Sequence, residues 1–155
     1  MRMLKKILGP RLVHNVDHIG MVVPSLEDAL VFYNNIFNCE VSDVMRLPAD
    51  GLNICFVELD NLRIEILEPI GLESPIKGLL EDYTVNQFIQ DNPSGGMHHV
   101  CYRVSDLNNV VKKIKEDGGR ILGVGGEWLG AEGNPITFID PNYTNGSLIE
   151  LKEKI

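Results

Sequence analysis

Two segments of the chain carry the same pattern of apolar and polar positions, 81 residues apart. The sequence DHIGMVVPSLEDAL at 17–30 aligns with HHVCYRVSDLNNVV at 98–111. In each segment an alternation typical of a β-strand is followed by apolar residues at i, i+3, i+4 and i+7, which indicate an amphipathic helix. Ser25 and Asp106 stand just before the helical stripes as N-cap residues. The repeat therefore predicts a strand and then a helix in each half of the chain.

Further strands follow each helix. The apolar runs at 52–59 and 62–67 are separated by Asp60-Asn61, which predicts a tight hairpin turn. We expect two helices, from 26 to about 37 and from 107 to the Gly118-Gly119 pair. The expected strands are 18–23, 52–59, 62–67, 99–104, 135–140 and 147–151. Two further candidate strands are 40–46 and 120–124.

We interpret residues 1–155 as a single domain of the α+β class. Two repeated βαβββ modules, at 16–68 and 97–152, are expected to form one curved mixed sheet. A helical linker at 69–96 would join them. In this linker Ser74-Pro75 is a helix-start signal, and Thr84 and Gln87 have the spacing of a capping box.

Composition and charge exclude several functional classes. Hydrophobic residues make up 44% of the chain and charged residues 23%, as in ordinary globular proteins. No apolar run approaches the ~20 residues that cross a bilayer. The net charge of −8 repels nucleic acid and anionic lipid, so we expect neither nucleic acid nor a membrane as a partner.

The cysteines argue for a reducing compartment. Cys39, Cys55 and Cys101 are odd in number and no two have C-x-x-C spacing, which argues against a disulfide framework and a zinc–thiolate site. The first dozen residues lack the apolar core of a signal peptide, and we expect a solvated basic tail there. The expected location is the cytoplasm, with the mitochondrial matrix as the alternative.

Four ionisable residues lie where the strand alternation points away from the helices. They are His18, Glu65, His99 and Glu150. A single His or Glu on the open face of a sheet is usually just solvated, but the repeat relates these four residues in pairs. Two imidazoles and two carboxylates suit a divalent ion such as Co²⁺, Mn²⁺, Ni²⁺ or Zn²⁺. We therefore predict one shared metal site, with His98 packed or behind it.

The chain resembles the vicinal-oxygen-chelate (glyoxalase) superfamily and, within it, the methylmalonyl-CoA epimerase family. The resemblance spans about residues 16–152 and is carried by DHIGMVVPSLEDALVFY, IEILEPIGLESPI, NPSGGMHHVCYRVSDL and GAEGNPITFIDP…GSLIEL. It implies the glyoxalase fold and carries the family's metal ligands over to His18, Glu65, His99 and Glu150. Members often have His and Lys where this chain has Glu132, Asn134, Asp140 and Asn142, so positive charge for the CoA phosphates is missing.

The resemblance also implies an activity. Family members interconvert (R)- and (S)-methylmalonyl-CoA by removing a proton from C2 and returning it on the other face, through an enolate stabilised by a divalent metal, with Co²⁺ favoured here. Glu65 and Glu150 are then expected to act as ligands and bases, Glu150 more firmly. Arg103 shares the face of His99, where it either holds the substrate carboxylate or is solvated. An acyl-CoA substrate and a homodimer follow from the same resemblance.

Two other functions remain open from the sequence. Glyoxalase I, a lactoylglutathione lyase, uses a similar His and Glu set on the same fold. A metal-free binding module of this fold is the second alternative. A ring-cleaving Fe(II) dioxygenase fits less well, because it uses two histidines and one carboxylate.

Overall fold

A computed structural model describes residues 9–71, 80–123 and 128–154. Within them the strands form one mixed sheet of nine strands in the order β2-β4-β5-β1-β6-β9-β8-β7, with β3 pairing β4. The strands are β1 (Val13–Val22), β2 (Glu40–Val41), β3 (Met45–Leu47), β4 (Leu52–Glu58), β5 (Arg63–Pro69), β6 (Gly96–Val104), β7 (Trp128–Leu129), β8 (Pro135–Ile139) and β9 (Ile149–Glu153). The helices are α1 (Leu26–Leu30), the π-helical turn η1 (Val31–Ile36), the 3₁₀ turn η2 (Glu81–Tyr83), α3 (Val85–Asp91) and α4 (Leu107–Glu116).

The strand order repeats about the centre of the sheet. β1 lies parallel to β5 and β6 lies parallel to β9, while β1 and β6 pair antiparallel with each other. Outside these pairs, β4 is antiparallel to β5, as β8 is to β9. The two halves thus meet through their first strands, and the α+β class and the single mixed sheet predicted from the sequence are confirmed.

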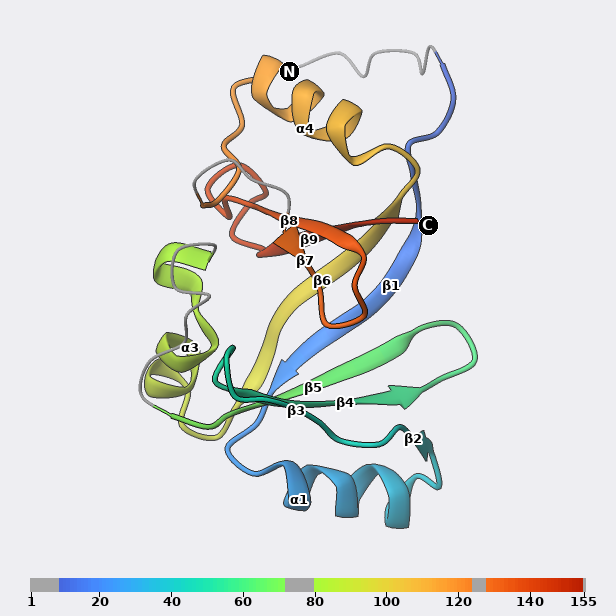
Figure 1. The fold of residues 1–155 in the computed structure, drawn as a ribbon, viewed down its shortest axis with the longest axis vertical. Helices are drawn as coiled ribbons and strands as arrows, with labels where there is room; N and C mark the ends of the chain where they lie inside the picture. Colours follow the sequence, from blue (N-terminus) through green and yellow to red (C-terminus); the bar gives the residue numbers. More distant parts are fainter. Residues whose placement is uncertain (1–8, 72–79, 124–127, 155) are drawn as a thin grey trace.

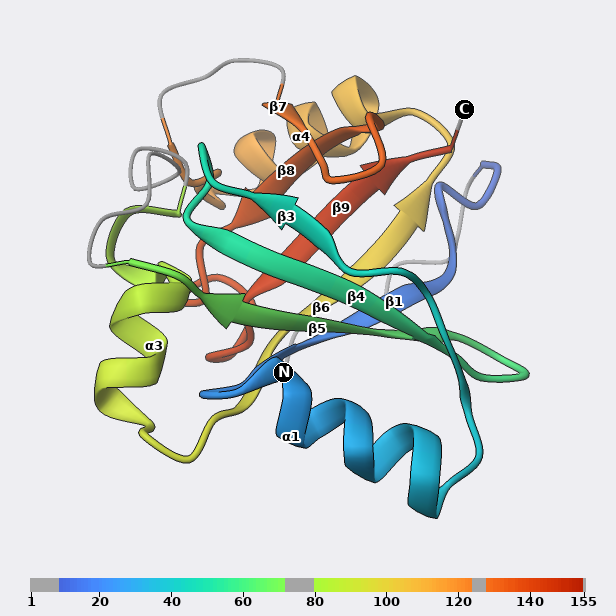
Figure 2. The ribbon, with the colours of Figure 1, turned by 60° about the horizontal axis from the view of Figure 1, so that its bottom comes forward.

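Helices α1 and α4 lie at opposite ends of the molecule with the strands between them, and α3 lies to one side (Figures 1 and 2). The predicted caps are confirmed: Ser25 Oγ accepts from Asp28 N at 3.2 Å, and Asp106 Oδ1 accepts from Asn109 N at 2.9 Å. Each helix begins where its side-chain cap satisfies an amide that the helix leaves unpaired.

The strand alternation correctly separates the two faces. On the helix side, Val57 and Ile66 pack beneath Leu26 of α1, while Val104 and Leu151 pack beneath α4. On the other side, two apolar clusters flank the middle of the sheet, one containing Val22, Leu52, Ile54, Phe56 and Leu67 and the other Leu122, Ile136, Phe138 and Leu148. Burial of both faces explains why several strands are apolar at consecutive positions.

Some element predictions need correction. The first helix does not continue as an α-helix to residue 37, because it widens into η1, which ends at Ile36, and Asn38 just beyond it has a φ of +53°. No strand covers 120–123; Ile121 forms an isolated bridge with Ile139, and the described edge strand is β7. The candidate at 40–46 divides into β2 and β3.

The predicted linker contains η2 and α3. Thr84 Oγ1 accepts from Gln87 N at 3.2 Å, which confirms the cap of α3, whereas Ser74-Pro75 lies outside the described residues. No helix among the described residues is long and apolar enough to cross a bilayer.

Candidate metal centre

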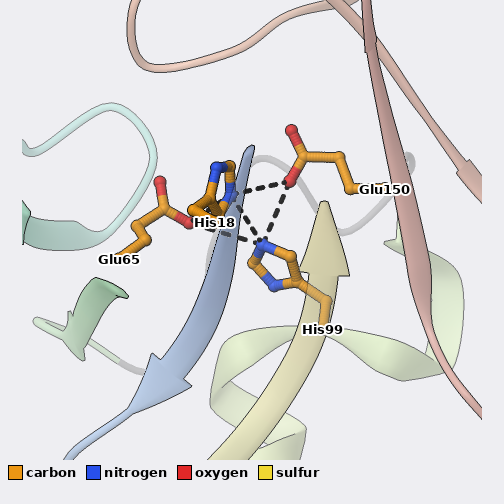
Figure 3. Close-up of side chains that lie close together, drawn as sticks. All are labelled: His18, Glu65, His99 and Glu150. Carbon is orange, nitrogen blue, oxygen red and sulfur yellow. Dashed lines mark hydrogen bonds and ion pairs between the residues drawn. The ribbon is translucent and has the colours of Figure 1, made fainter. Parts of the chain in front are cut away.

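The four predicted ligands converge on one point (Figure 3). His18 Nε2 lies 3.2 Å from His99 Nε2, 3.4 Å from Glu65 Oε2 and 3.5 Å from Glu150 Oε2. His99 Nε2 lies 3.4 Å from Glu65 Oε2 and 3.0 Å from Glu150 Oε2. All four donor atoms lie within 4.8 Å of one another.

These separations fit a coordination sphere. Metal bonds of about 2.0–2.2 Å to nitrogen and oxygen place neighbouring ligand atoms roughly 2.8–3.1 Å apart in octahedral geometry and roughly 3.3–3.6 Å apart in tetrahedral geometry. The five donor-atom separations given above, from 3.0 to 3.5 Å, are of this size. Two imidazoles and two carboxylates suit a divalent ion of borderline or harder character.

The face that carries the ligands is buried, whereas the sequence led us to expect an open one. His18, Glu65, His99 and Glu150 are only 3%, 7%, 6% and 6% exposed. Phe56 and Phe138 contact the rings of His18 and His99 edge-on, at centroid distances of 6.0 and 5.9 Å. The two halves of the sheet curve around the ligands, so the ligand charges are shielded from water.

Strand register explains the convergence. Gly20 of β1 pairs with Glu65 on one side and with His99 on the other, and Cys101 of β6 pairs with His18 and Glu150 in the same way. A Cβ atom at Gly20 would lie 2.1 Å from Cε1 of His99, so only glycine leaves room for that ring. Gly20 and Cys101 are 81 residues apart, the offset of the sequence repeat.

Behind His18 lies a buried charge network around Asp17. His18 Nδ1 is 2.8 Å from Asp17 Oδ1. Arg63 donates to the same carboxylate at 2.9 Å, Lys152 at 3.3 Å, and Arg103 through Nε at 3.0 Å and also through Nη2. Burial alone would raise the pKa of Asp17, but these hydrogen bonds and charges hold it well below its usual value.

Behind His99 lies a neutral relay. His99 Nδ1 is 3.0 Å from His98 Nδ1, and His98 Nε2 is 2.7 Å from the carbonyl oxygen of Tyr83. Burial, together with the nearby charge of His99, lowers the pKa of His98 to about 4. His98 thus sits directly behind the site, as predicted.

In the metal-free protein the four ligands form two charge pairs. Burial would lower the pKa of His99, but hydrogen bonds to Glu150 and Glu65 raise it to about 9, and the pKa of His18 is raised chiefly by Asp17. Although burial would raise the pKa of both ligand carboxyls, the two imidazoles lower it. A divalent cation would therefore replace two imidazole protons and leave both carboxylates ionised.

The ligands open onto a largely apolar cavity of about 470 Å³. Glu65, His99 and Glu150 form part of its wall. The rest of the wall is mainly apolar. It comes from β3, β4 and β5 on one side and from the 128–131 segment and β8 on the other. The apolar lining residues include Leu47, Leu52, Ile54, Leu67, Trp128, Leu129, Ile136 and Phe138. The cavity can accommodate a small acyl group next to the four donor atoms.

Arg103 lies outside this group of ligands. Two nitrogens of its guanidinium, Nε and Nη2, donate hydrogen bonds to Asp17 Oδ2, so its partner in the structure is an internal carboxylate. The substrate-binding role expected for Arg103 stays a prediction. Sequence reasoning missed Asp17, although the repeat offset that pairs His18 with His99 also pairs Asp17 with His98.

Comparisons with known proteins agree with this geometry. Residues 17–138 match the model of the Glyoxalase/Bleomycin resistance protein/Dioxygenase superfamily. The chain is 37% identical to the ethylmalonyl-CoA/methylmalonyl-CoA epimerase of Cereibacter sphaeroides, over 92% of this chain and 99% of that protein. It is 38% identical to human mitochondrial methylmalonyl-CoA epimerase, over 89% and 73% of the two chains. The chain belongs to the methylmalonyl-CoA epimerase family of the glyoxalase superfamily.

A solved structure shares the epimerase fold. It is a variant of the Streptomyces coelicolor methylmalonyl-CoA epimerase in complex with 2-nitronate-propionyl-CoA, with a TM-score of 0.77 over 92% of this chain and 95% of that one. At 23% identity this likeness shows the fold alone.

Three of the four positions where the sequence resemblance led us to expect basic residues have internal partners. Glu132 forms ion pairs with Arg63 and Lys152, and Asp140 with Arg120. Asn134 Nδ2 donates to the Glu153 carbonyl at 3.2 Å. In this structure these side chains are engaged with other parts of the chain.

Proposed function

We propose that this chain is a metal-dependent epimerase that interconverts (R)- and (S)-methylmalonyl-CoA. The observation that carries the proposal is the convergence of His18, Glu65, His99 and Glu150 on one point, with the last three in the wall of an apolar cavity. The names of the relatives with 37–38% identity give the substrate class, an acyl-CoA with an acidic C–H bond.

His18, Glu65, His99 and Glu150 would hold the metal ion. When bound, a divalent cation supplies Lewis acidity that lowers the cost of negative charge on the thioester oxygen. The resemblance favours Co²⁺, and the donor set also suits Zn²⁺, Mn²⁺ or Ni²⁺. The structure supports a divalent site without choosing among these ions.

We assign proton transfer to the two carboxylates, one on each side of the substrate. Glu65 and Glu150 come from equivalent strands of the two halves and flank the imidazoles (Figure 3). Inverting C2 requires one base to take the proton from one face and an acid to return a proton to the other. We assign these roles to Glu65 and Glu150, with Glu150 as the group on which exchange depends most.

The cavity supports a substrate with one polar end and an apolar chain. Its apolar lining would exclude water around C2, so that the enolate is protonated by a carboxylic acid rather than by solvent. The expected homodimer, and a location in the cytoplasm or the mitochondrial matrix, remain part of this proposal.

The two alternatives fit less well. Glyoxalase I has a comparable ligand set, but the relatives reported above are epimerases. A metal-free binding module fits less well because two imidazoles and two carboxylates within 4.8 Å of one another form a donor set that suits a divalent cation.

The test compares two substrates. The purified, metal-loaded protein is expected to epimerise methylmalonyl-CoA and to leave the methylglyoxal–glutathione adduct unchanged. The variant Glu150→Gln should lose at least about 100-fold in kcat, as expected for loss of a general acid–base group. Turnover of the glutathione adduct without epimerisation, or an unchanged rate in Glu150→Gln, would contradict the proposal.

A further inference from the structure

Each ligand imidazole is held from behind by the residue that precedes it, but by different chemistry. His18 meets the carboxylate of Asp17, whereas His99 meets the ring of His98. The repeat places Asp17 and His98 in equivalent positions. Two identical ligands therefore have one anionic and one uncharged supporting group.

The Tyr83 carbonyl determines how His98 can bond. A carbonyl oxygen only accepts, so His98 Nε2, at 2.7 Å, must be the protonated nitrogen. In neutral His98 the other nitrogen, Nδ1, can then only accept. Its neighbour at 3.0 Å is Nδ1 of His99, which must carry a hydrogen. When His99 gives up its second proton to bind a cation, the lone pair is therefore left on Nε2, the atom that faces the other three ligands.

We propose that His98 is a positioning residue of the metal centre. By donating to the Tyr83 carbonyl through Nε2 and accepting from His99 through Nδ1, His98 holds His99 in the tautomer that binds a metal through Nε2. This inference rests on the proposed metal site and concerns the orientation of one ligand. Hydrogen bonds of this kind behind a ligating histidine typically change metal affinity 10–100-fold.

The hydrogen bonds from Tyr83 through His98 to His99 connect the linker between the two halves to the metal site. Tyr83 lies in η2, and its ring packs against the cluster of Leu80, Ile136 and Phe138. Phe88 of α3 contacts the His98 ring edge-on at 5.4 Å. The first βαβββ half supplies His18 and Glu65, and the second supplies His99 and Glu150. The linker supplies the carbonyl that orients His99.

Two substitutions separate the two hydrogen bonds of His98. In His98→Asn the amide oxygen occupies about the position of Nδ1 and can accept from His99, but the side chain is too short to reach Tyr83. In His98→Gln the amide nitrogen occupies about the position of Nε2 and can donate to Tyr83, but the acceptor toward His99 is lost. Each variant is titrated with Co²⁺ and followed by visible absorption, and thermal unfolding of the metal-free proteins controls for folding.

We expect His98→Asn to keep Co²⁺ affinity within about 3-fold of wild type and His98→Gln to lose 10–100-fold. Equal affinity in all three proteins, or equal losses in the two variants, would overturn the inference. A measurement on the wild type needs no variant: in the Zn²⁺-loaded protein labelled with ¹⁵N, His99 Nδ1 should be protonated and His98 Nδ1 unprotonated. The reverse assignment would also overturn it.

Failure of this inference can be told from failure of the proposed function. If wild-type protein binds Co²⁺ and epimerises methylmalonyl-CoA while the two variants behave alike, only the role of His98 is wrong. If wild-type protein binds none of Co²⁺, Zn²⁺, Mn²⁺ and Ni²⁺, the proposed function fails and the role of His98 fails with it.

Discussion

At the scale of single residues, the metal centre depends on a missing side chain as much as on its ligands. A Cβ atom at Gly20 would lie 2.1 Å from Cε1 and 2.3 Å from Nδ1 of His99. In the other half, Cys101 occupies the equivalent position beside His18. The repeat predicted the ligands because they are chemically distinctive, but a glycine that makes room for a ring has no signature of its own in the sequence.

Gly20→Ala should displace the His99 ring and weaken Co²⁺ or Zn²⁺ binding by at least about 10-fold, comparable to losing a supporting contact. The matched control is Cys101→Ala, which removes atoms at the equivalent place and should keep metal affinity within about 3-fold. Isothermal titration calorimetry measures both. Wild-type affinity in Gly20→Ala would show that the ring can shift without cost.

Asp17→Asn should reduce both stability and metal affinity. Three cations would lose their shared buried counter-charge, which costs roughly 3–5 kcal/mol of unfolding free energy. Because the pKa of Asp17 is held below its ordinary 3.8, its ionised form stabilises the fold above that pH, and this stability is lost as pH falls. The difference from wild type should therefore be full at pH 7 and shrink in acid.

Urea unfolding of wild type and Asp17→Asn at several pH values tests this. The control Asp28→Asn changes an exposed acid of α1 and should stay within about 0.5 kcal/mol of wild type. A stability loss of the same small size in Asp17→Asn would mean that the cations find other partners.

At the scale of elements, the alternation of apolar positions predicted most of the fold. It separated the helix-facing residues, such as Ile66, from the ligand-facing ones, such as Glu65, because strand side chains alternate strictly. It did not predict the change from α1 to η1, because the apolar stripe at 26, 29, 30 and 33 has α-helical spacing, whereas a π-helix has i→i+5 hydrogen bonds. The isolated bridge at Ile121 depends on a partner, Ile139, that is distant in the sequence.

Ile66→Ala should lower the unfolding free energy by about 2–5 kcal/mol, because Ile66 is fully buried between β5 and α1. Ile36 is 66% exposed, so Ile36→Ala is the matched control and should cost less than about 0.5 kcal/mol. Thermal or urea unfolding of the metal-free proteins gives both values. A similar loss in the two variants would contradict the packing of α1 against the sheet.

At the scale of the whole molecule, neither half forms the site alone. Each contributes one imidazole and one carboxylate, which meet because β1 and β6 pair at the centre of the sheet. The repeat was enough to predict this meeting. The depth of burial, the network around Asp17 and the relay through His98 were not predicted. They depend on how the sheet curves, on the register shift next to Asp17 in β1 and on where the linker lies.

Metal binding should release protons. The pKa of His99 is raised to about 9 and that of His18 is raised as well, so both imidazoles are protonated at pH 7.5 in the metal-free protein. One divalent cation should then release about two protons, and affinity should rise with pH, less steeply once His99 is deprotonated because His18 still carries its proton. Calorimetry in buffers of different ionisation enthalpy counts these protons. Binding without proton release would contradict the paired charges in the metal-free site.

The most direct test of the central claim is deuterium incorporation at C2 of methylmalonyl-CoA in D₂O, measured with the purified protein before and after removal of metal by a chelator. The account predicts exchange in the metal-loaded protein, loss of exchange in the chelated protein, and recovery when one equivalent of Co²⁺ is added. Exchange that is unaffected by the chelator, or no exchange with any of the four candidate ions, would contradict it.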